Sequence, residues 1–136
     1  MKQRQNFKRE GTLMNNLLIA QSGGPTAAIN ATLAGALMIA EISEKVDKVY
    51  GALNGIQGVL EEKFIELDHI KTDPKSLKIL AETPAAALGS CRYKLKTTDQ
   101  YEKILSIFKK HQITYFIYIG GNDSMDTVLR LSDYCK

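Results

Sequence analysis

The sequence has little of what marks secreted, metal-rich or membrane proteins. Its 136 residues include two cysteines and two histidines. Cys91 and Cys135 lie far apart and fit no metal-ligand spacing, and such sparse cysteine use favours a reduced, cytoplasmic protein. The apolar segment 27–40 is interrupted by Asn30 and Thr32 and is too short to cross a bilayer. We therefore expect neither a membrane span nor a signal peptide.

A strong charge of one sign is also missing. The formal net charge is +3, and most of the excess lies in the first nine residues. Without a basic face or a nucleic-acid motif, we expect no nucleic-acid partner. The composition, 44% hydrophobic and 24% charged, is that of an ordinary globular protein. The length suits one small domain over 15–136, preceded by an extension over 1–14.

Apolar runs and helical periodicities alternate along the chain. The runs predict main strands over 17–21, 46–53 and 114–119, and a small strand over 64–67. The periodicities predict helices over 26–44, 73–83, from about 97, and 122–134, with a short helical turn over 59–62. This order predicts an α/β fold, a Rossmann-like parallel sheet with helices on both faces.

Two pairs of residues predict where helices begin. Asp73 before Pro74 reads as an N-cap followed by a proline in the first turn. Asp99 and Glu102 have the spacing of a capping box.

The first main strand runs into Ser22-Gly23-Gly24-Pro25 and then into a helix. Free N–H groups and the positive dipole end of a helix N-terminus favour an anion. In open α/β sheets, ligands bind beyond the carboxyl ends of the strands. The segment is neither a dinucleotide fingerprint nor a Walker loop, so it predicts a phosphate site of another kind. The alternative is a plain tight turn.

The last main strand ends in Gly120-Gly121-Asn122-Asp123-Ser124. Here the glycines would let the backbone approach a phosphate, while the oxygens of Asn122 and Asp123 would face Mg²⁺. The alternative is a turn followed by a helix cap, since Asn, Asp and Ser all cap helices well.

Arg92 is the candidate cation of the site. It follows Leu88-Gly89-Ser90-Cys91 in a loop, where an arginine is ordinarily only solvated. Beside a phosphate, its planar and permanently charged group can stabilise charge in the transition state. Lys94, nearby, is interpreted as a surface charge or a contact to an anionic substrate.

Together these segments resemble the phosphofructokinase family, most closely its pyrophosphate-dependent branch. The resemblance rests on four motifs in order, namely 21–30, 51–58, 88–92 and 119–125. It implies transfer of a phosphoryl group from pyrophosphate, or from ATP, to fructose 6-phosphate with Mg²⁺.

The resemblance also implies roles for single residues. Gly23, with Gly24, Gly120, Gly121 and Ser124, would bind the donor phosphates, and Arg92 would steady the transferred group. Asn122 and Asp123 would face the metal. Asp123 matches a position where ATP users carry glycine, and its carboxylate would occupy the place of the ATP α-phosphate.

The sequence departs from the family pattern in two ways. Asn122 stands where aspartate is usual, and the segment that carries the family's catalytic aspartate lies beyond Lys136. We therefore expect the N-terminal part of a longer, homo-oligomeric enzyme, inactive by itself. The alternatives are an ATP-dependent member of the family, a related NAD kinase, and a non-catalytic or truncated member.

Overall fold

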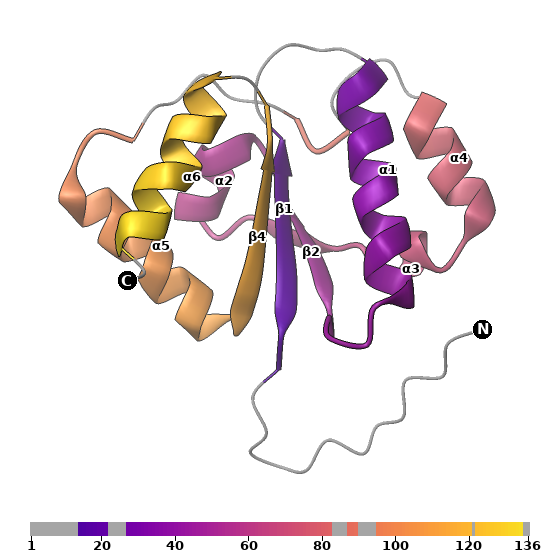
Figure 1. Cartoon of the computed structure of the whole chain (residues 1–136), viewed down its shortest axis with the longest axis horizontal. Coiled ribbons are helices and arrows are strands. Elements are labelled where there is room, and N and C mark those ends of the chain that lie inside the picture. The colour runs from indigo at the N-terminus through magenta and orange to yellow at the C-terminus, as the bar shows by residue number, and fades with distance from the viewer. Residues whose placement is uncertain (1–13, 22–26, 83–86, 90–94, 121, 135–136) are drawn as a thin grey trace.

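The computed structural model describes residues 14–21, 27–82, 87–89, 95–120 and 122–134. Its centre is a four-stranded sheet in the order β3-β2-β1-β4, of which Figure 1 labels β2, β1 and β4. The strands are β1 (Asn16–Gln21), β2 (Val49–Ala52), β3 (Phe64–Glu66) and β4 (Ile113–Ile119). The helices are α1 (Ala27–Ile42), α2 (Gly55–Leu60), α3 (Asp68–Lys71), α4 (Pro74–Glu82), α5 (Thr98–Lys110) and α6 (Asn122–Tyr134).

The sheet is parallel over β2, β1 and β4, as the alternation of elements predicts. β3 runs antiparallel to β2, so the sheet as a whole is mixed. The prediction of a parallel sheet is confirmed for the three main strands, and the small strand β3 adds an antiparallel edge. The reason is the short connection: α2 and one turn join β2 to β3, too little chain for a crossover to a parallel neighbour.

Helices cover both faces of the sheet, as predicted (Figure 1). β1 is buried along its whole length, and its side chains alternate between two apolar clusters. Leu17 and Ile19 pack against α1, and α3 and α4 contact α1. Leu18 and Ala20 pack against α2, α5 and α6 on the other face. β1 is thus the central strand of the core.

Two local predictions differ from the structure. The helix after β2 begins at Gly55 rather than near Val59, because Asn54 and Gly55 take positive φ angles of 62° and 63° that turn the chain at once. The capping box of α5 is Thr97 with Gln100, not Asp99 with Glu102. Thr97 has the extended backbone of an N-cap, whereas Asp99 already lies within the first turn.

The start of α4 is as predicted. α4 begins at Pro74, and Asp73 before it accepts hydrogen bonds from the Lys75 N–H (3.2 Å) and the Ser76 hydroxyl (2.8 Å). Among the described helices, none has the length and apolar character needed to cross a bilayer.

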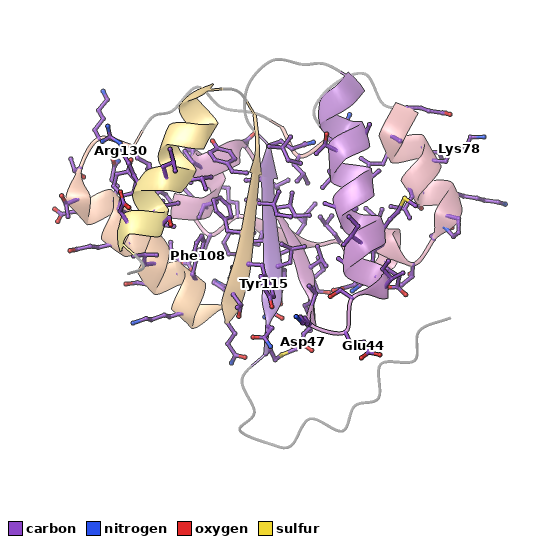
Figure 2. All side chains as sticks on the ribbon, in the orientation of Figure 1. Glu44, Asp47, Lys78, Phe108, Tyr115 and Arg130 are labelled. Carbon is purple, nitrogen blue, oxygen red and sulfur yellow. The ribbon has the colours of Figure 1, made fainter. Side chains whose placement is uncertain are left out.

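Side chains and backbone tie the beginnings of the three parallel strands together. Buried Asn16 accepts from the Lys48 N–H (3.1 Å) before β2 and donates to the His111 carbonyl (2.9 Å) before β4. Asp47 Oδ2 accepts from the Asn15 N–H (2.6 Å), and Met14 donates to Gln112 Oε1 (2.8 Å). We call this set of contacts the amino edge, and Figure 2 shows Asp47 there.

Candidate functional site

The two glycine-rich segments leave the sheet next to each other. β1 and β4 are adjacent and parallel, and Gln21 lies opposite Ile119 in their register. The segments that start at Ser22 and Gly120 therefore begin from neighbouring positions. Since β2 lies on the other side of β1, the boundary between β1 and β4 is also where the order of the strands reverses. Ligands of open α/β sheets bind at such a switch point.

A helix follows each segment. α1 begins at Ala27 and α6 at Asn122, so both helix N-termini lie a few residues beyond the ends of β1 and β4. The first N–H groups of a helix have no partner within the helix, and together with the positive dipole end they favour an anion. Both helices therefore begin near the place where the sequence predicts a phosphate site, and that site stays a prediction.

The segment that leads to Arg92 reaches the same edge of the sheet through two buried amide side chains. Gln21 Oε1 accepts a hydrogen bond from the Leu88 N–H at 2.9 Å. Asn30 Oδ1 accepts one from the Ala87 N–H at 2.9 Å. Gln21 Nε2 in turn donates to Asn30 Oδ1 at 3.1 Å, which links the two amide side chains to each other.

The loop after β2 also binds the segment 87–89. The Asn54 N–H donates to the Leu88 carbonyl at 2.8 Å. Gly89 has φ +76°, and a Cβ there would lie 2.6 Å from Asn54 Oδ1. Gly51, in β2, leaves room for Leu88, because a Cβ at Gly51 would lie 2.8 Å from Leu88 Cδ2. A side chain at Gly51 would displace Leu88, and one at Gly89 would crowd Asn54 and be strained by the positive φ.

We call this set of contacts the carboxyl edge. It is formed by Gln21, Asn30, Asn54, Leu88 and Gly89. It joins parts of all the first three motifs found in the sequence, while Ile119 of the fourth motif pairs with Gln21. The motifs that lie far apart in the sequence therefore meet at one end of the sheet.

The predicted site residues are only partly within the described structure. Gly120 is exposed directly after β4. Asn122, Asp123 and Ser124 begin α6, but their side chains lie outside the described part. Four further residues also lie outside it, namely Gly23, Gly24, Arg92 and Gly121. The roles assigned to these residues remain predictions.

The sequence reasoning missed Gln21, Asn30 and Asn54 as parts of the site. A signal was present for the first two, because each is a polar residue on the apolar face of a strongly apolar element. Both are fully buried. Buried polar side chains almost always have hydrogen-bond partners, so such positions point to a tether between segments.

No group of three or more His, Cys, Asp or Glu side chains that could hold a metal ion occurs among the described residues. A clear pKa shift within the described part belongs to Glu62, away from the carboxyl edge. Hydrogen bonds from the Lys110 ammonium (2.9 Å) and the His111 ring (2.9 Å) hold the pKa of this carboxyl below its ordinary value.

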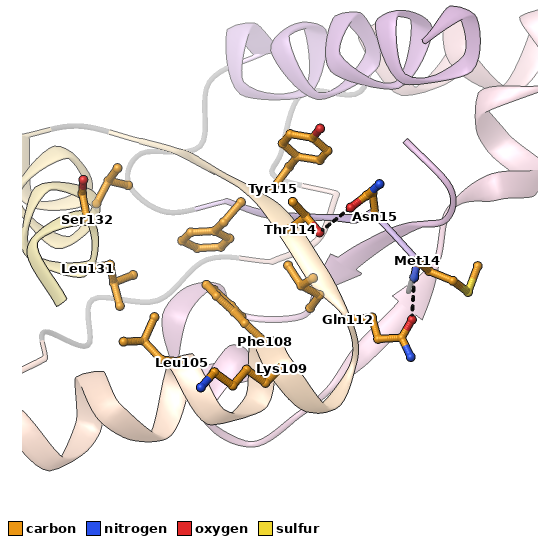
Figure 3. A pocket seen from close by; sticks show the side chains of 13 residues that line it. Met14, Asn15, Leu105, Phe108, Lys109, Gln112, Thr114, Tyr115, Leu131 and Ser132 are labelled. Atoms are coloured by element: carbon orange, nitrogen blue, oxygen red, sulfur yellow. Dashed lines mark hydrogen bonds between the residues drawn. The ribbon is translucent and has the colours of Figure 1, made fainter. Parts of the chain in front are cut away.

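An open hollow of about 750 Å³ lies beside β4 (Figure 3). Its lining is largely apolar and includes Leu105, Phe108 and Leu131, with Met14 and Gln112 at the amino edge. The residues of β4 that line it are 113–116, at the start of the strand. The hollow is therefore separate from the candidate phosphate site, which lies beyond the strand's other end.

Comparison with known proteins agrees with this arrangement. The family model described as Phosphofructokinase matches residues 16–136. A pyrophosphate–fructose 6-phosphate 1-phosphotransferase from Xanthomonas campestris is 48% identical over 125 residues, which are 89% of this chain and 29% of the relative. One from Rhodospirillum rubrum is 43% identical over 117 residues, 86% of this chain and 28% of the relative.

A solved structure has the same fold. The crystal structure of the pyrophosphate-dependent phosphofructokinase from Nitrosospira multiformis matches with a TM-score of 0.81 and 42% identity. The match covers 89% of this chain and 30% of that one. The chain spans 29% and 28% of the length of the two relatives named above, from Xanthomonas campestris and Rhodospirillum rubrum.

Proposed function

The chain belongs to the phosphofructokinase family, and from that premise we propose that it forms the phosphoryl-donor-binding part of a pyrophosphate-dependent 6-phosphofructokinase. The whole enzyme moves a phosphoryl group between pyrophosphate and the 1-hydroxyl of fructose 6-phosphate. The observation that carries this proposal is the meeting of four sequence motifs at the carboxyl ends of β1, β2 and β4.

Phosphoryl transfer depends mainly on positioning and on charge stabilisation, and the proposed roles follow from that. The backbone at Gly23, Gly24, Gly120 and Gly121, together with Ser124, binds the donor phosphates. Arg92 stabilises the charge on the transferred group, because its guanidinium stays charged and can donate two parallel hydrogen bonds.

The donor is pyrophosphate rather than ATP in this proposal. Asp123 carries a negative charge where the α-phosphate of ATP would lie, and like charges in close contact are costly. Pyrophosphate ends before that point. The names of the relatives at 48% and 43% identity support the same choice of donor.

Asn122 and Asp123 are the residues proposed to hold Mg²⁺. Their amide and carboxylate oxygens are hard ligands of the kind that this ion prefers, and both residues stand in the first turn of α6. Bound Mg²⁺ neutralises part of the charge on the phosphates. We further propose that the enzyme works in the cytoplasm as a homo-oligomer.

The test is phosphoryl transfer to fructose 6-phosphate by the whole enzyme in the presence of Mg²⁺, with pyrophosphate and ATP compared. We expect activity with pyrophosphate alone, and Asp123→Gly should raise the activity with ATP. Activity with ATP alone would overturn the donor assignment. Activity with neither donor would overturn the proposed function and favour a non-catalytic member of the family.

A further inference from the structure

Gln21 and Asn30 stand out because they are fully buried yet carry none of the roles proposed above. Gln21 is the last residue of β1, and its side chain points to the face that Leu17 and Ile19 share with α1. An apolar residue would continue that cluster without any cost of burying an amide. The presence of an amide there calls for a reason other than packing.

The hydrogen bonds supply that reason. Gln21 uses one amide atom to accept from the Leu88 N–H (2.9 Å) and the other to donate to Asn30 Oδ1 (3.1 Å). Asn30 Oδ1 accepts a second bond from the Ala87 N–H (2.9 Å). Leu88 and Gln21 are 67 residues apart, and Ala87 and Asn30 are 57 apart. The pair thus connects the end of β1, the first turns of α1 and the segment 87–89.

These three elements flank the proposed phosphate site. Gln21 directly precedes Ser22-Gly23-Gly24 in the sequence, and Asn30 belongs to α1, the next helix. Gly89 precedes Arg92 by three residues in the sequence. A single buried pair therefore joins the end of β1 and the start of α1 to residues 87–89.

On the basis of the proposed function, we propose that Gln21 and Asn30 are positioning residues for phosphoryl transfer, which hold residues 87–89, shortly before Arg92 in the sequence, at the end of β1 and the start of α1. They do not touch the donor in this proposal. Their effect is on the rate of transfer, because misplacing a charge-stabilising group by about 1 Å can cost about a hundredfold in rate.

The principal variant is Gln21→Met in the whole enzyme. Methionine has a similar volume but no side-chain oxygen that could accept a hydrogen bond from the Leu88 N–H. This buried donor therefore loses its partner. We expect kcat with pyrophosphate to fall about 10- to 100-fold, with the KM for fructose 6-phosphate nearly unchanged. An unchanged kcat would overturn the proposal.

The matched control is Asn16→Leu at the amino edge. Asn16 is also a buried amide with one accepted and one donated hydrogen bond to backbone groups. Its loss should lower the stability to a similar extent but leave kcat unchanged. An equal fall of kcat in both variants would mean that Gln21 acts only through stability, which would also overturn the proposal.

A double variant separates positioning from a general structural effect. If Gln21 acts through the Arg92 segment, Gln21→Met should lower kcat much less when Arg92→Ala is already present. Full additivity of the two changes would contradict the proposal. This cycle depends on pyrophosphate activity in the unaltered enzyme, so failure of the proposed function is recognised first and separately.

A measurement without any variant applies if Gln21→Met does not fold. If Gln21 and Asn30 hold residues 87–89 for donor binding, then binding of pyrophosphate also stabilises the hydrogen bonds of this pair. The hydrogen exchange of the Leu88 N–H in the whole enzyme should therefore slow when pyrophosphate is added. An exchange rate that is the same with saturating pyrophosphate would overturn the proposal.

Discussion

The two ends of the parallel strands are held together in different ways. At the amino edge, Asn16 and Asp47 bind backbone groups that lie directly before the neighbouring strands. At the carboxyl edge, Gln21 and Asn30 bind each other and then a segment that belongs to no strand. The amino edge therefore joins the beginnings of paired strands, whereas the carboxyl edge holds residues 87–89 at the end of β1.

This difference matches what each end must do. Strand register needs only local contacts, and each amino-edge bond joins segments that are already adjacent through strand pairing. Loops have no ladder of backbone hydrogen bonds like that between strands. Their position therefore depends on side chains that reach them from the rigid sheet. Substitutions at the carboxyl edge should thus affect activity, and those at the amino edge stability.

The largest effect is expected at Gly58 in α2. A Cβ there would overlap the Leu53 carbonyl oxygen, and this atom is backbone that cannot rotate away. Gly58→Ala should cost about 3 kcal/mol or more of the free energy of unfolding, measured by chemical denaturation. Gly35→Ala in α1 is the control, since nothing lies within 4 Å of its Cβ. The control should be neutral or stabilising by about 0.5–1 kcal/mol.

A somewhat smaller effect is expected at Gly89 of the carboxyl edge. Gly89→Ala places a side chain at φ +76°, a conformation that costs about 1–2 kcal/mol for an L-residue, and crowds Asn54 Oδ1. In the whole enzyme, kcat should fall as well. Adding Asn54→Gly removes the crowded side chain and should restore part of the stability. A Gly89→Ala variant with normal stability and normal kcat would contradict the described geometry.

Asn16→Leu breaks the amino edge alone. It leaves the Lys48 N–H and the His111 carbonyl without their side-chain partner, which should lower the free energy of unfolding by about 1–2 kcal/mol. Thermal or chemical denaturation measures the loss. Kinetics of the whole enzyme should not change, and a lowered kcat would erase the distinction between the two edges.

The smallest effect concerns Glu62, which binds His111 beside the amino edge. Because Lys110 and His111 hold its pKa below the ordinary value in the folded chain, the carboxylate contributes stability above the unfolded pKa. That contribution is lost as the pH falls through the folded pKa. Glu62→Gln should therefore be less stable than the wild type at neutral pH, and the difference should vanish in acid.

The control for Glu62 is Glu61→Gln, which removes an exposed ion pair with Lys63 (3.1 Å). Exposed pairs contribute little, so its effect should be smaller. Unfolding curves at several pH values measure both variants. A stability difference between wild type and Glu62→Gln that grows in acid would contradict a lowered pKa of the Glu62 carboxyl.

Much of the fold could be predicted from the sequence, because its signals are local. The run Leu17–Gln21 and the helical spacing of Ile29, Leu33 and Leu37 depend on neighbours a few residues away, and β1 and α1 lie where these patterns indicate. The direction of β3 could not be read in the same way. Strand direction depends on pairing with β2, and a run of three residues carries no direction in its pattern.

The positions of the two glycine-rich segments at the sheet could be predicted, but the contacts around them could not. Glycines after strands indicated the carboxyl ends of β1 and β4, and α1 and α6 do begin just beyond them. The contact from Gln21 to Leu88 joins residues 67 positions apart, and no short-range pattern encodes it. Only the unusual presence of amides on apolar faces pointed toward it.

The most direct test of the carboxyl edge compares two N–H groups of the unaltered 136-residue chain. Leu88 and Lys96 both donate to a glutamine Oε1, at 2.9 Å and 2.7 Å, but the first bond is buried and the second exposed. The Leu88 N–H should exchange with deuterium at least about 100-fold more slowly than the Lys96 N–H, after correction for intrinsic rates. Equal protection would contradict the claim that Gln21 fixes this segment to the sheet.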